Sequence, residues 1–268
     1  MAKEKFTAFW LGYVPSGTEE GVGPLLGATP GCVDTVTLAF SNLYPGNTTC
    51  NSFLQKANSE DAIRAGIAQI RKQSPNTKIL MSIIGTPNPA VGWNTGITDP
   101  VLFGAWLESF ADSWGLDGFD IDNEDLDSFP GPQFVATVKA MRHAMPDKII
   151  TLDTYQFGRD QAVIKALADD LSYINTIAYF LGFDEMVALV EQYATVIPPG
   201  KISIGVKSDL VGPITQGTSL ADTKRLSAWE PSGGPKYGMT LWNLSSDIKA
   251  VTGQANGAWT AAIAETLP

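Results

Sequence analysis

The sequence predicts an α/β fold, a single (β/α)8 TIM barrel, and three observations carry this prediction. Short apolar runs rich in β-branched and aromatic residues alternate with longer amphipathic segments along the chain. Eight such units share 268 residues, about 33 residues each, which is close to the length of a βα unit. No linker or low-complexity stretch interrupts the series, so residues 1–268 are predicted to form one domain.

The predicted strands are runs of six to ten residues, in which Val, Ile, Thr and aromatic residues dominate. Each run is followed by a turn signal and then by a helical pattern, as expected for parallel strands joined by crossover helices. The eight strands are expected at residues 5–13, 34–43, 78–85, 115–124, 148–154, 173–180, 201–206 and 237–242.

The predicted helices fill the gaps between these strands. The first begins with a capping sequence at Ser59 and places Ile63, Ile67 and Ile70 on one stripe, and the second has Pro100 in its first turn. The crossover at 15–31 is rich in Gly and Pro and is expected to hold little regular helix. Helices are expected at 59–73, 99–114, 133–144, 159–170, 184–193, 219–228 and 254–267.

The charge balance narrows the classes of partner. Lys and Arg number 18 against 28 Asp and Glu, a net charge of −10, and such a field repels nucleic acid and anionic membranes. No run approaches the roughly 20 apolar residues of a membrane span. The first residues lack a signal-peptide pattern, but a mature secreted chain would begin in the same way, so the compartment stays open, with secretion slightly favoured over the cytoplasm.

The two cysteines are expected to be free thiols. Cys32 and Cys50 flank the predicted strand 34–43, which separates its own ends by roughly 30 Å. A disulfide needs Cα atoms within about 7 Å, so a bridge would require the chain after the strand to fold far back. A bridge remains the alternative.

Irregular segments follow several strands, at 44–58, 86–98 and 206–217. In a parallel barrel these positions lie at the C-terminal face, where the loops build the functional site. The sequence therefore predicts one functional face.

The fourth predicted strand carries an acidic run with a strand period. Asp120, Asp122 and Glu124 share one face, whereas Phe119 and Ile121 share the other and are expected to pack under the helices. Carboxyl groups spaced about 6 to 7 Å apart inside a barrel cannot all stay ionised, so some of their pKa values are expected to be raised. Three acids could also bind a metal, but His143, the one histidine, lies on a predicted helix, and no metal or cofactor is expected.

This run resembles the DxxDxDxE signature of glycoside hydrolase family 18, with Asp117 as its first acid and Glu124 as its last. On the preceding strand, Ser82 lies in an element similar to the family's SxGG, and it is expected to hydrogen-bond to Asp120. Tyr179 stands at the tyrosine of the family's MxYD element, where Phe180 replaces the Asp that chitinases carry. The similarity covers about residues 5–267 and is greatest to the single-domain endo-β-N-acetylglucosaminidases of the H and F type.

The resemblance implies a retaining hydrolysis assisted by the substrate's own acetamido group. In that scheme Glu124 is the general acid and then the base, and Asp122 binds the acetamido N–H. Asp120 shares a proton with Asp122, and Tyr179 orients the acetamido oxygen. Further candidate substrate contacts lie on or at the ends of predicted strands: Trp10, Phe40, Ser82, Tyr155, Gln156, Trp242 and Asn243. The aromatic residues Tyr13, Tyr44, Trp93, Phe157 and Phe183 also lie near strand ends. Each of these aromatic residues has core or loop packing as its alternative, and barrel packing is the alternative for Trp242.

The expected activity is that of an endo-β-N-acetylglucosaminidase that cleaves the GlcNAc-β1,4-GlcNAc core of N-glycans, with high-mannose or hybrid glycans favoured. The single domain would be catalytic and would act as a monomer on a glycoprotein or a GlcNAc-containing oligosaccharide. A small chitinase is the first alternative, and a non-catalytic carbohydrate-binding protein on the same scaffold is the second. Glu124 argues against the second alternative, because binding proteins of this family usually lack that acid.

Overall fold

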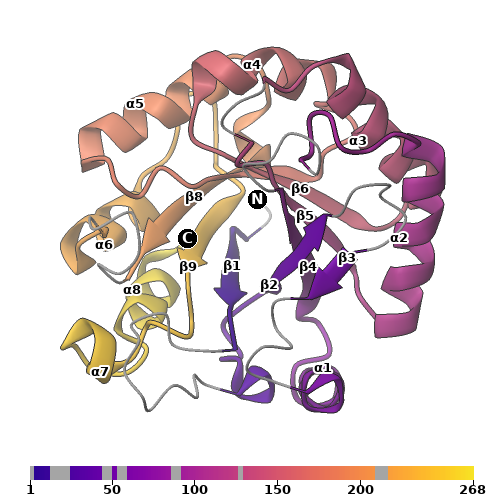
Figure 1. Cartoon of the computed structure of the whole chain (residues 1–268). Helices are drawn as coiled ribbons and strands as arrows, with labels where there is room; N and C mark the ends of the chain where they lie inside the picture. Colours follow the sequence, from indigo (N-terminus) through magenta and orange to yellow (C-terminus); the bar gives the residue numbers. More distant parts are fainter. Residues whose placement is uncertain are drawn as a thin grey trace.

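Eight parallel strands close into a barrel, as the sequence predicts (Figure 1). The computed structural model describes residues 3–12, 25–43, 50–52, 59–85, 92–125, 129–208 and 217–268. Neighbouring strands follow the order β1-β9-β8-β7-β6-β5-β4-β2, and the pairing of β1 with β2 closes the ring. The barrel strands are β1 (Lys5–Trp10), β2 (Thr35–Leu43), β4 (Lys78–Ile84), β5 (Gly118–Asp122), β6 (Ile149–Thr154), β7 (Tyr173–Thr176), β8 (Ile202–Lys207) and β9 (Gly238–Trp242).

The helices form a layer around this ring (Figure 1). Three of them begin at the side-chain caps that their sequences favour, because Ser59, Asp99 and Ser219 each accept a hydrogen bond from a first-turn backbone N–H. The helices are α1 (Glu60–Gln73), α2 (Pro100–Trp114), α3 (Pro132–Ala144), α4 (Phe157–Ala166), α5 (Phe183–Tyr193), α6 (Leu220–Ala228), α7 (Lys249–Thr252) and α8 (Ala258–Thr266).

Some strand and helix boundaries differ from the predicted ones, and two short elements were not predicted. The strand expected at 173–180 ends at Thr176, and the helix expected at 254–267 begins at Ala258, after the short helix α7 that the sequence analysis missed. A ninth strand, β3 (Cys50–Ser52), pairs antiparallel with the end of β2 and was also missed, because three residues are too few to show a period. The described part of the first crossover holds one 3-10 turn, Leu26–Ala28.

The main hydrophobic core lies between the strands and the helices. On β5, Phe119 and Ile121 are fully buried in it, and the Phe119 ring lies 6.1 Å from that of Phe110 on α2. The stripe predicted on α1 is confirmed, since Ile63, Ile67 and Ile70 are all buried. Strand alternation then directs the residues between these apolar positions into the barrel.

Much of the barrel interior is polar. Asn175 Oδ1 accepts a hydrogen bond from Thr240 Oγ1 at 2.8 Å, and Thr240 lies 2.7 Å from the hydroxyl of Ser203. The Tyr173 hydroxyl lies 3.2 Å from Thr7 Oγ1 on the opposite side. These groups are buried and hydrogen-bonded. The ionisable groups near the C-terminal strand ends therefore lie above a polar barrel interior.

Two further expectations concern the cysteines and membrane-spanning helices. Cys32 is a free and exposed thiol, as expected, while the side chain of Cys50 lies outside the described residues. Among the described residues, no helix is both long enough and apolar enough to span a bilayer.

Candidate active site

The acidic run lies where the strand period places it. Asp120 is fully buried and Asp122 is 4% exposed, and both point away from the packed faces of Phe119 and Ile121. Glu124 follows β5 by two residues and reaches solvent at the C-terminal end of the barrel. The acids therefore run from the barrel interior toward its mouth.

The first acid of the signature has a structural role at the other end of the strand. Asp117 Oδ2 accepts hydrogen bonds from Arg71 Nη2 at 2.7 Å and from the backbone N–H of Ile79 at 2.8 Å. These contacts connect the beginning of β5 to α1 and β4. Asp117 therefore stabilises the strand that carries the other acids.

Asp120 is surrounded by hydrogen-bond donors. The predicted bond from Ser82 is present, with Oγ 2.7 Å from Asp120 Oδ2. Thr151 Oγ1 donates to Oδ1 at 2.5 Å, and Asn175 Nδ2 approaches the same oxygen at 3.3 Å. The parallel register explains this convergence, since Ser82 and Thr151 pair with Asp120 on the strands at either side. Burial raises the pKa of Asp120, and these donors oppose the rise.

Asp122 and Glu124 are biased toward their protonated forms. Burial raises the pKa of Asp122 well above its ordinary value, and the neighbouring charges of Glu124 and Asp120 add to the rise. The side chain of Glu124 reaches solvent, yet nearby protein displaces enough water around its carboxyl to raise its pKa as well. A carboxylic acid that stays protonated and that a ligand can reach is suited to donate a proton.

The structure adds Asp153, which the sequence analysis missed. It is 4% exposed on β6 and pairs in register with Asp122. Asn175 Nδ2 donates to Asp153 Oδ1 at 2.8 Å, which joins Asp153 to the network around Asp120. The signal was present, because strand alternation places Asp153 on the same inward face as Thr151.

Arg159 is the second residue that was missed. Its side chain is 5% exposed, and its guanidinium contacts Asp160 through Nε at 2.6 Å and through Nη2 at 3.0 Å. Nη2 also donates to the carbonyl of Asn123 at 2.9 Å, directly before Glu124. Its charge lowers the pKa values of Asp122 and Glu124 against the rise caused by burial. No sequence signal marked Arg159, since a helix-start arginine is ordinarily a surface residue.

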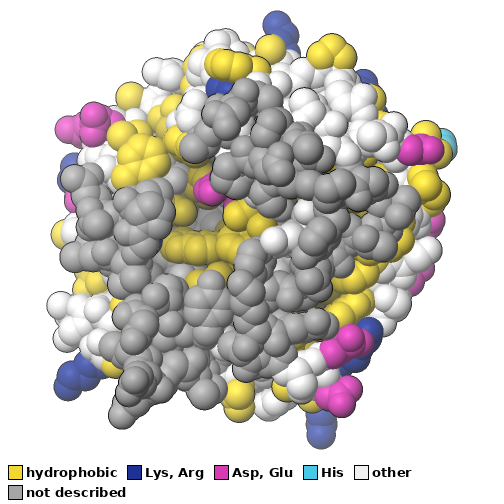
Figure 2. Space-filling model, in the orientation of Figure 1, with side chains coloured by type: hydrophobic (Ala, Val, Ile, Leu, Met, Phe, Trp, Pro, Cys, Tyr) yellow, Lys and Arg dark blue, Asp and Glu magenta, His cyan; other side chains and the backbone are white. Residues whose placement is uncertain are grey.

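An aromatic cluster lies inside the barrel on the side of β1, β2 and β9. The ring of Trp242 lies 5.3 Å from that of Phe9 and 5.5 Å from that of Phe40, and both Phe40 and Trp242 stay partly exposed. The register of β2 against β4 shifts between Ala39 and Ser41, so Phe40 is the extra residue of a bulge. Figure 2 shows hydrophobic side chains and an acidic side chain inside the hollow of this face. Two predicted substrate contacts, Phe40 and Trp242, are thus brought together.

Three other predicted residues lie at neighbouring strand ends. Tyr179 follows β7 and is 8% exposed. Tyr155 and Gln156 follow β6 and are partly exposed, and the Tyr155 ring lies edge-on to Phe180 at 5.6 Å. Phe180, which replaces the chitinase Asp, therefore packs against an aromatic neighbour.

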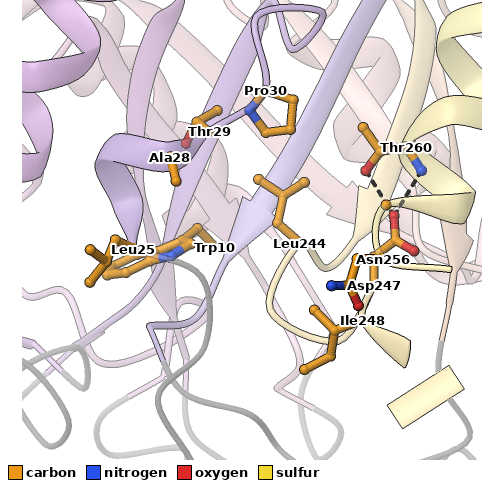
Figure 3. A pocket seen from close by; sticks show the side chains of 11 residues that line it. Trp10, Leu25, Ala28, Thr29, Pro30, Leu244, Asp247, Ile248, Asn256 and Thr260 are labelled. Atoms are coloured by element: carbon orange, nitrogen blue, oxygen red, sulfur yellow. Dashed lines mark hydrogen bonds between the residues drawn. The ribbon is translucent and has the colours of Figure 1, made fainter. Parts of the chain in front are cut away.

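The structure corrects the placement of Trp10. This residue is 2% exposed and points toward the helical layer, because the neighbouring Phe9 takes the inward position on β1. Its ring lines a separate pocket of about 250 Å³ with Leu25, Leu244 and Ile248 (Figure 3). The Trp10 ring therefore lies on the side of β1 that faces the helical layer, whereas the prediction placed it beside the acids.

Asn243 is also placed differently from the prediction. It is fully buried, and its Oδ1 accepts a hydrogen bond from the backbone N–H of Ser246 at 2.9 Å. The turn after β9 uses the Asn243 side chain, because an Asn at such a turn caps the following backbone. The Asn243 side chain is therefore engaged within this turn.

The remaining aromatic candidates pack within the protein. Trp93 is fully buried, Phe157 lies against Tyr193 at 5.4 Å, and Phe183 lies under the guanidinium of Arg225. Tyr13 and Tyr44 lie outside the described residues. In the part of the chain that is described, no group of three or more His, Cys, Asp or Glu side chains has the geometry of a metal site.

Comparison with known proteins places this geometry in a fold family. No protein-family model and no curated protein sequence matches the chain. Among solved structures it is similar to a putative chitinase A from Streptomyces coelicolor, with a TM-score of 0.78, 17% identity and 98% of each chain covered. A chitinase of glycoside hydrolase family 18 from Pseudoalteromonas aurantia has a TM-score of 0.72 and 19% identity over 98% of this chain and 100% of that one.

A second kind of enzyme has the same architecture. The endo-β-N-acetylglucosaminidase from Cordyceps militaris matches with a TM-score of 0.66 and 17% identity over 100% of this chain and 92% of that one. Identities this low establish the fold and leave the substrate open. The chain therefore has the (β/α)8 fold of glycoside hydrolase family 18.

Proposed function

We propose that the protein is a retaining endo-β-N-acetylglucosaminidase of glycoside hydrolase family 18 that hydrolyses the GlcNAc-β1,4-GlcNAc core of N-glycans. One observation carries the proposal. Asp120, Asp122 and Glu124 run from the barrel interior to its mouth, and Glu124 is a solvent-accessible acid whose pKa is raised. This is the arrangement that an acid needs to protonate a glycosidic oxygen at the end of the barrel.

The proposed mechanism uses the substrate's acetamido group as the nucleophile. Glu124 protonates the leaving oxygen while the acetamido oxygen attacks the anomeric carbon, which forms an oxazolinium ion and breaks the glycosidic bond. The Glu124 carboxylate then takes a proton from water, which attacks the same carbon and gives net retention. Because the attack is intramolecular, the proximity of the acetamido oxygen to the anomeric carbon lowers the activation barrier, and no protein nucleophile is needed.

Asp122 and Tyr179 serve the acetamido group in this scheme. Asp122 Oδ1 is buried and has no hydrogen-bond partner among the described residues, so it is available to accept the acetamido N–H. Tyr179 lies at the end of the next strand but one and would orient the acetamido oxygen. Asp120 stabilises Asp122 from below, and the aromatic cluster of Phe9, Phe40 and Trp242 offers a partly exposed face for sugar stacking.

The substrate assignment favours N-glycans for two reasons. The sequence resembles the H and F type enzymes, and Phe180 stands where chitinases carry an Asp. The similar structure from Cordyceps militaris is described as an endo-β-N-acetylglucosaminidase. We expect the protein to act as a monomer on high-mannose or hybrid glycans of a glycoprotein.

A small chitinase is the second candidate. The similar structures from Streptomyces coelicolor and Pseudoalteromonas aurantia are described as chitinases and cover nearly the whole chain. Trp242 at the end of β9 stays partly exposed, as a stacking platform for a GlcNAc polymer requires. A non-catalytic binding protein is the third reading, and the acid at position 124 disfavours it.

The test compares two substrates in parallel. We expect the protein to release the glycan of ribonuclease B, seen as a downward shift of the protein band, and to leave chitooligosaccharides intact. Cleavage of the chitooligosaccharides alone would establish the chitinase. Binding without release of product from either substrate would establish the non-catalytic reading.

Glu124→Gln tests the assignment of the acid. The amide keeps the size of the side chain but cannot donate the proton, so we expect the variant to lose turnover by about 10²- to 10⁴-fold and to retain glycan binding. Glu108→Gln is the matched control, because Glu108 is an exposed residue on α2. Full turnover by Glu124→Gln would remove Glu124 from the proposed role.

A further inference from the structure

Asp153 is hydrogen-bonded to Asp120 but has no part in the mechanism above. It comes from β6 and pairs in register with Asp122, so the two side chains enter the barrel at the same level. It is 4% exposed, and Asn175 Nδ2 donates to its Oδ1 at 2.8 Å. Asp153 is therefore a third carboxyl group buried within the barrel, beside Asp120 and Asp122.

The hydrogen bonds around Asp120 show which carboxyl group accepts. Ser82 Oγ, Thr151 Oγ1 and Asn175 Nδ2 all lie within hydrogen-bond distance of its two oxygens, and Asp153 also hydrogen-bonds to it. An amide N–H can only donate, and the Asn175 amide is oriented by Thr240, which donates to Asn175 Oδ1 at 2.8 Å. Asp120 is thus the ionised acceptor of the network.

A hydrogen bond between two carboxyl groups requires a proton on one of them. Since Asp120 already accepts from three neighbours, the proton of this bond resides on Asp153. Among the described residues, no Lys or Arg forms an ion pair with Asp120, Asp122 or Asp153. A carboxyl group in this position retains its proton, because ionising it would add a second uncompensated charge beside Asp120.

We infer that Asp153 is a positioning residue that keeps its proton on the hydrogen bond to Asp120, which holds Asp120 ionised and leaves Asp122 available to the substrate. This inference rests on the proposed function for its consequence in catalysis. The proton that Asp120 would otherwise share with Asp122 comes from Asp153 instead. Asp122 Oδ1, which lacks a partner among the described residues, is then directed to the acetamido N–H without first breaking a bond to Asp120.

The electrostatics of the cluster agree with this distribution of protons. Burial raises the pKa of Asp153 well above its ordinary value, and the titratable groups that add to the rise are Asp120, Asp122 and Glu124, all from β5 or the residues directly after it. Its neighbour on β7, Asn175, is neutral. An amide at position 153 reproduces both bonds of the protonated acid, since its oxygen accepts from Asn175 and its N–H donates to Asp120.

The test uses Asp153→Asn as a mimic of the protonated acid and Asp153→Leu as a variant without either hydrogen bond. Infrared spectra at about pH 6, where an ordinary Asp is ionised, report protonated carboxyl groups through their C=O stretch. We expect Asp153→Asn to lose the intensity of one protonated carboxyl group. Asp247→Asn is the control, because Asp247 is buried but accepts from the backbone and hydroxyl groups of α8. Equal intensity in the wild type and in Asp153→Asn would overturn the inference.

Turnover gives the second measurement. We expect Asp153→Asn to keep kcat within about threefold, and Asp153→Leu to lose about ten- to hundredfold in kcat with little change in KM, as for the loss of a hydrogen bond to a charged group. A folded Asp153→Asn that loses as much as Asp153→Leu would show that an ionised Asp153 is required and would overturn the inference. If the wild type cleaves neither substrate, the proposed function fails, whereas the infrared measurement still decides the protonation of Asp153.

Discussion

Replacing Arg159 by Met tests how the protein holds the loop that carries Glu124. The Arg159 side chain is 5% exposed, and its guanidinium pairs with Asp160, whose side chain is 3% exposed. It also donates to the carbonyl of Asn123. The substitution preserves most of the apolar volume but removes the charge and three hydrogen bonds.

The cost follows from the burial of the pair. Removing one partner of a buried ion pair leaves an uncompensated charge and typically costs about 3–5 kcal/mol. Asp160 keeps one donor, Thr154 Oγ1 at 2.7 Å, so the expected loss for Arg159→Met lies near the lower end, about 3 kcal/mol. Adding Asp160→Asn removes the orphaned charge and should recover part of this loss, with a coupling of roughly 1–3 kcal/mol.

Urea unfolding of the wild type, both single variants and the double variant completes the thermodynamic cycle. Lys224→Met is the control, because Lys224 and Glu265 form an exposed pair worth at most about 1 kcal/mol. A loss for Arg159→Met as small as that of the control, or a double variant that is less stable than the sum of the single variants, would refute the reasoning.

The same variant has an expected effect on activity. Arg159 lowers the pKa values of Glu124 and Asp122, so its removal raises them. Glu124 must be protonated to act as the acid, and the alkaline limb of kcat/KM therefore moves to higher pH in Arg159→Met. Arg159→Lys keeps the charge and should keep the limb. A limb that moves to lower pH in Arg159→Met would contradict this electrostatic role.

Two further predictions concern stability away from the acids. The pKa of Glu4 is raised to about 7 by burial, although Lys236 Nζ lies 2.7 Å from Glu4 Oε2, so the folded state binds more protons than the unfolded one and stability falls as pH rises from about 4.5 to about 7. Thermal unfolding of Glu4→Gln should lack this fall, and an unchanged pH dependence would disprove it. Gly118→Ala places a Cβ 1.9 Å from the carbonyl oxygen of Ile149 and should cost more than about 3 kcal/mol, whereas Gly115→Ala, at φ +67° with no atom within 4 Å of its Cβ, should cost about 1–2 kcal/mol in the same urea titration.

The periodic features of the chain were predictable from the sequence. Alternation on the acidic strand placed Asp120 and Asp122 in the barrel and Phe119 in the outer core, because a strand turns successive side chains to opposite faces whatever surrounds it. The cap at Ser59 was predictable because a cap uses backbone groups within one turn. Such local rules were enough to predict eight strands and the barrel that they form.

Local rules did not decide which strand ends meet or which face a residue near an irregularity takes. The bulge at Phe40 depends on the register between β2 and β4. It brings Phe40 against Trp242, which lies at the end of β9, beyond β1. Trp10 shows the same limit, because its aromatic character suggested a sugar contact while its neighbour Phe9 holds the inward position.

The sequence by itself determined the fold class, the acidic run and the position of its terminal acid. Tertiary structure alone decided that Asp153 meets Asp120 and that Arg159 lies beside the loop of Glu124. The physical reason is that these contacts join residues on different βα units, and their energies arise from burial and charge that exist only once the barrel has closed.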